Sequence, residues 1–156
     1  MVQVCYQFIV NEGFQLFMAI FLGGLIGLER EMKGKPAGLR TTILICLGAT
    51  LFMMLSAKVA MMAGSQGADP ARIASGIVTG IGFLGAGSIF HGEGMVQGLT
   101  SAATIWVVGA LGLAIGCGHY VLAVGVTLIL LLVLSALGRL ECYISDKCKT
   151  KIAEEK

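Results

Sequence analysis

The segment RIASGIVTGIGFLGAGSIF, residues 72–90, decides between two incompatible folds for this chain. Its residues Gly80, Gly82 and Gly85 have the spacing G-x-G-x-x-G, which in a Rossmann fold brings a backbone loop against a pyrophosphate. That fold requires a strand before the glycines, a helix after them and an acidic residue about 20 positions further on. Here the glycines lie within a mostly apolar stretch of membrane-spanning length, and Trp106 stands near the position of the required acid. The sequence therefore argues against a nucleotide site and for a membrane helix.

The composition of the whole chain supports the same conclusion. Of its 156 residues, 56% are hydrophobic and 13% are charged, and the mean hydropathy is +0.89. A soluble domain carries about 25% charged residues, because its surface must be wetted. This chain has too few polar residues to cover a water-exposed globule, so we expect the lipid bilayer to cover much of it. The net charge of +2 gives no indication of a nucleic-acid partner, and we expect none.

Five segments approach the roughly 20 apolar residues that a helix needs to cross the hydrocarbon core. We therefore predict an all-α fold, a polytopic membrane helical bundle of about five transmembrane helices. The predicted transmembrane domain covers residues 1–140, and a short basic cytoplasmic tail covers residues 141–156. The last two segments are so close in sequence that they must form an antiparallel hairpin. The five segments are residues 13–28, 39–57, 72–90, 99–116 and 120–138.

The basic residues orient the predicted bundle, because cytoplasmic loops are enriched in Lys and Arg. Five spans place the first loop and the C-terminal tail on the same side, and nine of the 11 basic residues then lie there. We therefore predict that the N-terminus is outside and that the C-terminus is cytoplasmic. The nine residues are Arg30, Lys33, Lys35, Arg40, Arg139, Lys147, Lys149, Lys151 and Lys156.

Helix geometry gives the glycines of the third segment a role in helix packing. At about 100° per residue, Gly76, Gly80 and Gly87 share one stripe, and Gly82 and Gly85 lie roughly opposite. Small residues let helix backbones approach each other in lipid. Two such faces predict two close neighbours, so we expect the third segment to be the central helix. Two alternatives stay open: membrane helices are richer in glycine in general, or the glycines unwind the helix locally.

The first and fourth segments carry small residues that could match the third. Gly23 and Gly27 lie four residues apart in the first segment, and Gly109 and Gly112 lie in the fourth. The fifth segment contains LILLLVL, which we expect to face lipid. We therefore predict that the first and fourth helices pack against the third.

The charged residues of the first loop lie at the predicted helix ends. Glu29, Arg30 and Arg40 bracket this loop, where they form an interfacial ion-pair network or anchor the helix ends by snorkelling. Glu29 with Lys33, and Glu31 with Lys35, have the i, i+4 spacing of stabilising helical ion pairs. These residues are candidates for a functional polar cluster at the inner end of the bundle.

The opposite end carries Asp69 and Arg72, three residues apart, which form a helix-capping pair or a functional pair. Asp69 is the candidate metal ligand. Thr100 is the second residue of the fourth segment and is expected to hydrogen-bond a neighbouring helix or its own backbone. The sequence offers no charge in mid-membrane and no Ser–His–Asp or Cys–His arrangement. We therefore expect no enzyme, no catalytic residue and no cofactor, with Mg²⁺ open as a ligand or substrate.

Three ordered blocks resemble the N-terminal transmembrane domain of the MgtC/SapB family: GLEREMKGKPAGLRTTILICLGATLFMMLS, DPARIASGIVTGIGFLGAGSI and GLTSAATIW, residues 27–56, 69–89 and 98–106. The resemblance implies a multi-pass protein of the bacterial inner membrane, linked to magnesium limitation and to survival inside host cells. It leaves two functions open. One is association with itself, as a homo-oligomer, or with a larger membrane complex such as the ATP synthase. The other is transport of Mg²⁺ or another ion, as a transporter or channel.

The chain departs from the family pattern in two ways that bear on function. A glutamine common in the third span is Gly76 here, which removes a polar group that could bind an ion within the membrane. Many members also carry an ACT-like C-terminal domain, and we expect none after the short tail of this sequence. The first departure argues against transport, and the second argues against regulation through such a domain.

Overall fold

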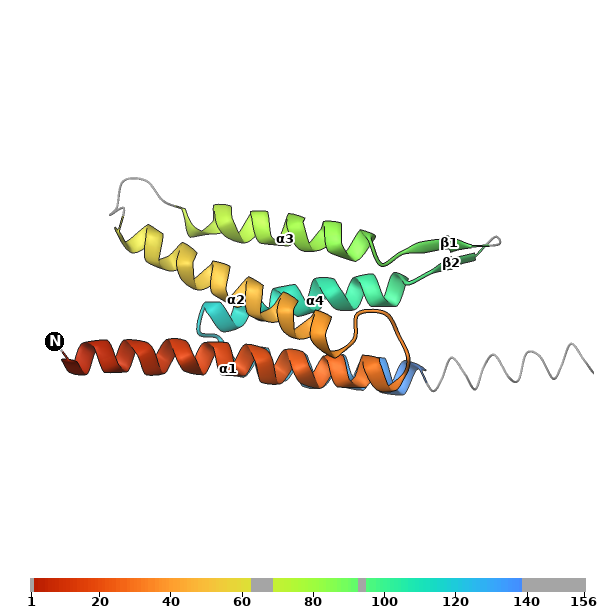
Figure 1. The fold of residues 1–156 in the computed structure, drawn as a ribbon, viewed down its shortest axis with the longest axis horizontal. Helices are drawn as coiled ribbons and strands as arrows, with labels where there is room; N and C mark the ends of the chain where they lie inside the picture. Colours follow the sequence, from red (N-terminus) through yellow and green to blue (C-terminus); the bar gives the residue numbers. More distant parts are fainter. Residues whose placement is uncertain (1, 63–68, 93–94, 139–156) are drawn as a thin grey trace, which may run out of the picture.

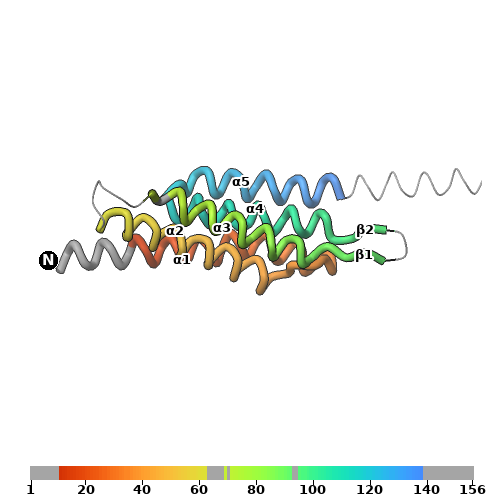
Figure 2. Tube along the Cα trace, turned by 90° about the horizontal axis from the view of Figure 1, so that it is seen from above, coloured from red at the N-terminus to blue at the C-terminus, as the bar shows by residue number. Residues whose placement is uncertain are grey.

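The computed structural model describes residues 2–62, 69–92 and 95–138, which form five helices lying side by side (Figures 1 and 2). Successive helices run in opposite directions, so the chain traverses the bundle five times. A short two-stranded hairpin projects from one end. In chain order the elements are α1 (Val2–Met32), α2 (Leu39–Met62), α3 (Pro70–Ala86), β1 (Phe90–Gly92), β2 (Met95–Gln97), α4 (Leu99–Gly116), α5 (Tyr120–Leu132) and the π-helical η2 (Val133–Leu137).

The prediction of an all-α membrane bundle is confirmed. Four helical segments are long and apolar enough to cross a membrane: Asn11–Met32, Leu39–Met62, Leu99–Gly116 and Tyr120–Leu137. The fifth helix, α3, has 17 residues and is about 25 Å long, at the short end of what the hydrocarbon core requires. The orientation across the membrane stays a prediction, and the proposed tail, residues 141–156, lies outside the described residues.

Local signals explain where the helices begin. Asp69 Oδ1 accepts a 2.9 Å hydrogen bond from the amide of Ala71, and Pro70 occupies the first position of α3, where it has no amide hydrogen to lose. The amide of Leu39, at the start of α2, donates to Glu31 Oε2 over 2.9 Å. Because that carboxylate caps α2, Glu31 makes this contact in place of the expected ion pair with Lys35.

The core lies between α1, α2, α4 and α5, and its fully buried side chains include Ile26, Cys46, Val108 and Ile115. Glycine permits close approaches between α1 and α2 and between α2 and α4. A Cβ added to Gly112 of α4 would lie 2.5 Å from the Cys46 carbonyl oxygen of α2. The pair α2 and α4 forms the centre of the bundle, because α2 contacts α1, α3 and α4, and α4 contacts the other four helices.

The expectation that the third segment is the central helix is wrong. α3 lies at the edge of the bundle and packs against α2 and α4 along one face, which carries the buried Ile81 and Gly85 (Figure 1). Its other face is exposed because α1 packs on α2 rather than on α3. A second expectation also needs correction, since the segment at 72–90 is helical only to Ala86 and then forms a turn and β1. α3 is a continuous helix, which excludes local unwinding there.

The β1–β2 hairpin was not predicted. It is antiparallel, with Phe90 paired to Gln97, His91 to Val96 and Gly92 to Met95. All six residues are exposed. The hairpin projects from the same end of the bundle as the α1–α2 connection and the end of η2 (Figure 1). That end therefore combines the hairpin with the basic first loop.

Candidate functional site

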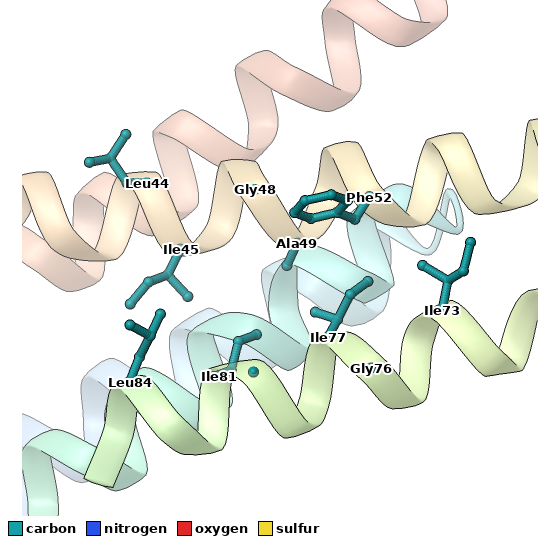
Figure 3. A pocket seen from close by; sticks show the side chains of 11 residues that line it. Leu44, Ile45, Gly48, Ala49, Phe52, Ile73, Gly76, Ile77, Ile81 and Leu84 are labelled. Carbon is teal, nitrogen blue, oxygen red and sulfur yellow. The ribbon is translucent and has the colours of Figure 1, made fainter. Parts of the chain in front are cut away.

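An apolar groove of about 590 Å³ runs between α2 and α3 on the outside of the bundle. Its lining consists only of Leu, Ile, Phe, Ala and Gly residues. Figure 3 shows Ile45 of α2 and Ile77 of α3 pointing into the space between the two helices, and Phe52 lies above them. Because it has no polar side chain, this groove suits an apolar occupant and provides no side-chain oxygen for a metal ion.

Three glycines make this groove wide. Gly48 of α2 and Gly76 and Gly80 of α3 all line it, and a Cβ added to any of them would meet nothing within 4 Å. Bare backbone on both walls is the surface against which another membrane helix packs closely. The groove is thus an unfilled helix-packing surface at the edge of the described bundle.

The other predicted packing glycines have different surroundings. Gly23 and Gly27 of α1 lie against α2, where added Cβ atoms would come within 3.1 Å of the Thr42 carbonyl oxygen and 2.6 Å of Leu39 Cα, respectively. Gly109 of α4 accommodates the side chain of Ile81, and Gly85 lies against Ala102, so α3 and α4 are neighbours as predicted. The remaining two glycines contact no other helix: Gly82 has open space, and Gly87 is the C-cap of α3.

A polar cluster lies at the end of the bundle that carries the first loop. Arg30 is only 4% exposed, and its Nη2 donates a 2.6 Å hydrogen bond to Ser101 Oγ in the first turn of α4. Lys33 Nζ lies 2.6 Å from Glu29 Oε1 and donates to the Leu134 carbonyl over 2.8 Å. These contacts connect α1 to α4 and to η2.

This arrangement corrects the predicted ion-pair network. Glu29 pairs with Lys33, as the i, i+4 spacing predicted, but Arg30 binds a hydroxyl and Arg40 lies exposed in the first turn of α2. The sequence analysis missed Ser101, because a serine 71 positions away carries no sign of its partner. Arg30 is buried between helices rather than anchoring a helix end at the surface.

The predicted residues at the other positions do not assemble into a site. Asp69 caps α3, and the exposed Arg72 is joined to it by a hydrogen bond from the Arg72 amide to the Asp69 carbonyl. The Thr100 carbonyl accepts a 2.7 Å bond from Thr104 Oγ1, while the residue itself is exposed. Within residues 2–62, 69–92 and 95–138, no three His, Cys, Asp or Glu side chains gather as a metal site would require.

Contacts across the far end of the bundle were also not predicted. Gln15 Nε2 donates to the Ile115 carbonyl over 3.2 Å, and Lys58 Nζ lies 2.7 Å from Glu12 Oε1. Phe14 and Tyr120 pack edge to face with ring centroids 5.2 Å apart. These contacts tie α1 to α2, α4 and α5.

Residues 16–143 match the MgtC family. The chain is 44% identical over 137 residues to "Putative magnesium transporter YhiD" of Escherichia coli (strain K12), which covers 85% of this chain and 63% of that protein. It is 39% identical to "Protein SrpB" of Synechococcus elongatus, over 82% of this chain and 75% of that protein. It is 43% identical to "Protein MgtC" of Salmonella typhimurium, over 81% of this chain and 50% of that protein.

No solved structure matches the chain. The chain spans 63% of the length of YhiD and half the length of the Salmonella protein, so it corresponds to part of each. The family match covers most of the sequence, including all of α2, α3, α4 and α5. With its apolar helices and this match, the chain is a membrane protein that belongs to the MgtC family.

Proposed function

We propose that this protein acts by helix–helix association, with the α2–α3 groove receiving a transmembrane helix from a second copy or from a larger membrane complex. One observation carries the proposal: Gly48, Gly76 and Gly80 expose bare backbone on both walls of an apolar groove. Helices gain little in lipid from hiding apolar side chains, so association depends on close packing and dispersion contacts. A helix of fixed shape fills such a groove with more contacts than mobile acyl chains do.

The packing of α3 supports this proposal. Among the α3 residues with described burial, only Ile81 and Gly85 are buried, so most of the surface of this helix is left uncovered by the rest of the described chain. Ser75 and Thr79 are also exposed on this helix, and the Thr79 hydroxyl bonds the Ser75 carbonyl. Neither residue lines the groove, whose α3 wall is apolar and glycine-rich, and a partner helix can pack closely against such a wall.

The physiological setting of the proposal comes from the family. We place the protein in the bacterial inner membrane, with a non-enzymatic role under magnesium limitation and in survival within host cells. The name of the relative YhiD, a putative magnesium transporter, supports the link to magnesium. A complex such as the ATP synthase is one candidate for the larger assembly, and a homo-oligomer is the other.

Filling the groove tests the association directly. We expect Gly80→Leu to abolish co-purification of the partner, or of a second tagged copy, because the leucine side chain occupies the space of the incoming helix. A Cβ at Gly80 meets nothing in the chain, so the protomer itself should fold. Measurement is by affinity co-purification from membranes after cross-linking.

The matched control is Gly82→Leu, which makes the same change on the same helix. Gly82 also has open space around its Cβ position but does not line the groove. Association should survive in this variant. Equal association in wild type, Gly80→Leu and Gly82→Leu would show that the groove is not the docking surface.

Ion transport is the second candidate, and the name of YhiD as a putative magnesium transporter favours it. Mg²⁺ requires oxygen ligands, whereas the groove is apolar and Asp69 Oδ1 already accepts a backbone hydrogen bond. We expect proteoliposomes to show no Mg²⁺ flux above protein-free vesicles, measured with an entrapped fluorescent indicator. Flux that is lost in Asp69→Asn, which keeps the helix cap but removes the charge, would establish transport instead.

A further inference from the structure

One nitrogen of the buried Arg30 side chain has no hydrogen-bond partner among the described residues. Arg30 is only 4% exposed. Its Nη2 donates a hydrogen bond to Ser101 Oγ, whereas its Nε is buried and has no hydrogen-bond partner within the described residues. An ionic side chain buried with an unpaired donor costs free energy. The residue is held in place from α4, yet part of its hydrogen-bonding capacity is unused.

The first turn of α4 adds a second positive element at the same place. The α4 N-cap is Gly98, which makes no side-chain capping bond, so the first amides of this 18-residue helix lack a side-chain acceptor there. The positive end of the helix dipole lies at these amides. The Arg30–Ser101 bond holds the guanidinium against this turn, and Leu99 and Thr100 are exposed, so the turn can be reached from outside the bundle.

The nearby carboxylate does not balance these charges. Glu29 is next to Arg30 but lies 2.6 Å from Lys33 through Oε1, so two cations share one carboxylate. The cluster has one net positive charge in addition to the helix end. A negatively charged group that lies near both a helix N-terminus and a guanidinium is stabilised by each of them.

We propose that Arg30 and the N-terminal turn of α4 bind a phosphate group, as the headgroup of an anionic phospholipid or as a free phosphate ion. Phosphate oxygens accept hydrogen bonds from guanidinium and from the amides of a helix N-terminus. Arg30 lies two residues before the end of a membrane-length helix, where we expect lipid headgroups to meet the protein. Basic pockets between helix ends are known to suit anionic headgroups. This inference does not depend on the proposed helix association.

The test uses the full-length protein in a neutral detergent and follows its thermal unfolding. Three additions are compared: short-chain phosphatidylglycerol, short-chain phosphatidylcholine, and inorganic phosphate against chloride at equal ionic strength. Binding to the folded state raises the Tm as the ligand concentration rises. We expect phosphatidylglycerol or phosphate to raise it and phosphatidylcholine not to. A rise with phosphatidylglycerol alone identifies the lipid as the source, and an equal rise with phosphate identifies the free ion.

Two variants locate the site. Arg30→Gln keeps a donor for Ser101 but removes the charge, and Thr100→Glu places a carboxylate in the first turn of α4 as an internal competitor. Each should weaken the apparent affinity about tenfold, the loss expected for one charge-assisted hydrogen bond. Arg40→Gln removes an exposed charge from the same end of the bundle and should leave the affinity unchanged.

Three results would overturn the proposal. One is the absence of any Tm rise with phosphatidylglycerol and phosphate in the wild type. Another is an equal loss of affinity in Arg40→Gln, because the effect would then be a general attraction to the basic end. The third is unchanged affinity in Thr100→Glu, which decides the matter on its own where Arg30→Gln does not fold.

Discussion

Replacing Gly112 with alanine is expected to destabilise the bundle by about 3 kcal/mol, the usual upper range for overpacking a tight core. The added Cβ would lie 2.5 Å from the Cys46 carbonyl oxygen and 3.2 Å from the amide nitrogen of Thr50. These are backbone atoms of α2, so no side-chain rotation relieves the clash and the two central helices must separate. Separation would also lengthen the 3.0 Å bond from Thr50 Oγ1 to the Gly112 carbonyl. Unfolding by SDS in mixed micelles, followed by circular dichroism, measures the change.

Gly48→Ala is the matched control for this prediction. It makes the same substitution in α2, but a Cβ at Gly48 meets nothing within 4 Å. Alanine is a better helix former than glycine by about 1 kcal/mol in water, so this variant should be as stable as the wild type or more so. If Gly112→Ala and Gly48→Ala lose similar stability, the close approach of α2 and α4 does not determine the fold.

The sequence was sufficient to predict the helices, because membrane-length apolar segments are a strong one-dimensional signal. The prediction of helices over 39–57, 99–116 and 120–138 agrees with α2, α4 and the α5–η2 segment. The start of α3 at Pro70 also follows from local chemistry, since Asp69 and Pro70 are typical of a helix N-terminus. The hairpin after α3 gave no such signal, because its strands have only three residues each.

The order of packing could not be predicted in the same way. Glycine periodicity identifies which faces of a helix are small, but not which neighbour meets each face. In water a buried face is also apolar, whereas in lipid the buried and exposed faces are both apolar, so that contrast is lost. The glycine pattern of α3 therefore predicts contacts with neighbouring helices of the same chain on both faces, whereas Gly76 and Gly80 line an open groove.

The polar cluster shows a similar limit. The Glu29–Lys33 pair was predictable from i, i+4 spacing, because Lys33 directly follows the helix that carries Glu29. The partners of Arg30 and Lys33 on α4 and η2 are 71 and 101 positions away in sequence. Such contacts depend on how the helices are arranged, and only the structure places Arg30 inside the bundle instead of at its surface.

Replacing Lys33 with methionine is expected to destabilise the protein by about 2 kcal/mol, more than most changes of a partly exposed residue. The substitution removes the 2.8 Å hydrogen bond from Lys33 Nζ to the Leu134 carbonyl. It also removes the cation 2.6 Å from the Glu29 carboxylate, whose side chain is only 12% exposed. Because Glu29 is largely buried, removal of its partner leaves a carboxylate without its ion pair, which is costly. The same unfolding measurement applies, with Lys58→Met as the control.

The Glu12–Lys58 pair has a similar separation, 2.7 Å, but its carboxylate side chain is 31% exposed, so Lys58→Met should cost less than about 1 kcal/mol. Adding Glu29→Gln to Lys33→Met separates the two contributions to the larger loss. If the unpaired carboxylate dominates, the double variant regains stability because a neutral amide is cheaper to bury than a charge. If the bond to the Leu134 carbonyl dominates, the double variant is no more stable than Lys33→Met, and Lys33 then acts mainly by holding η2 against α1.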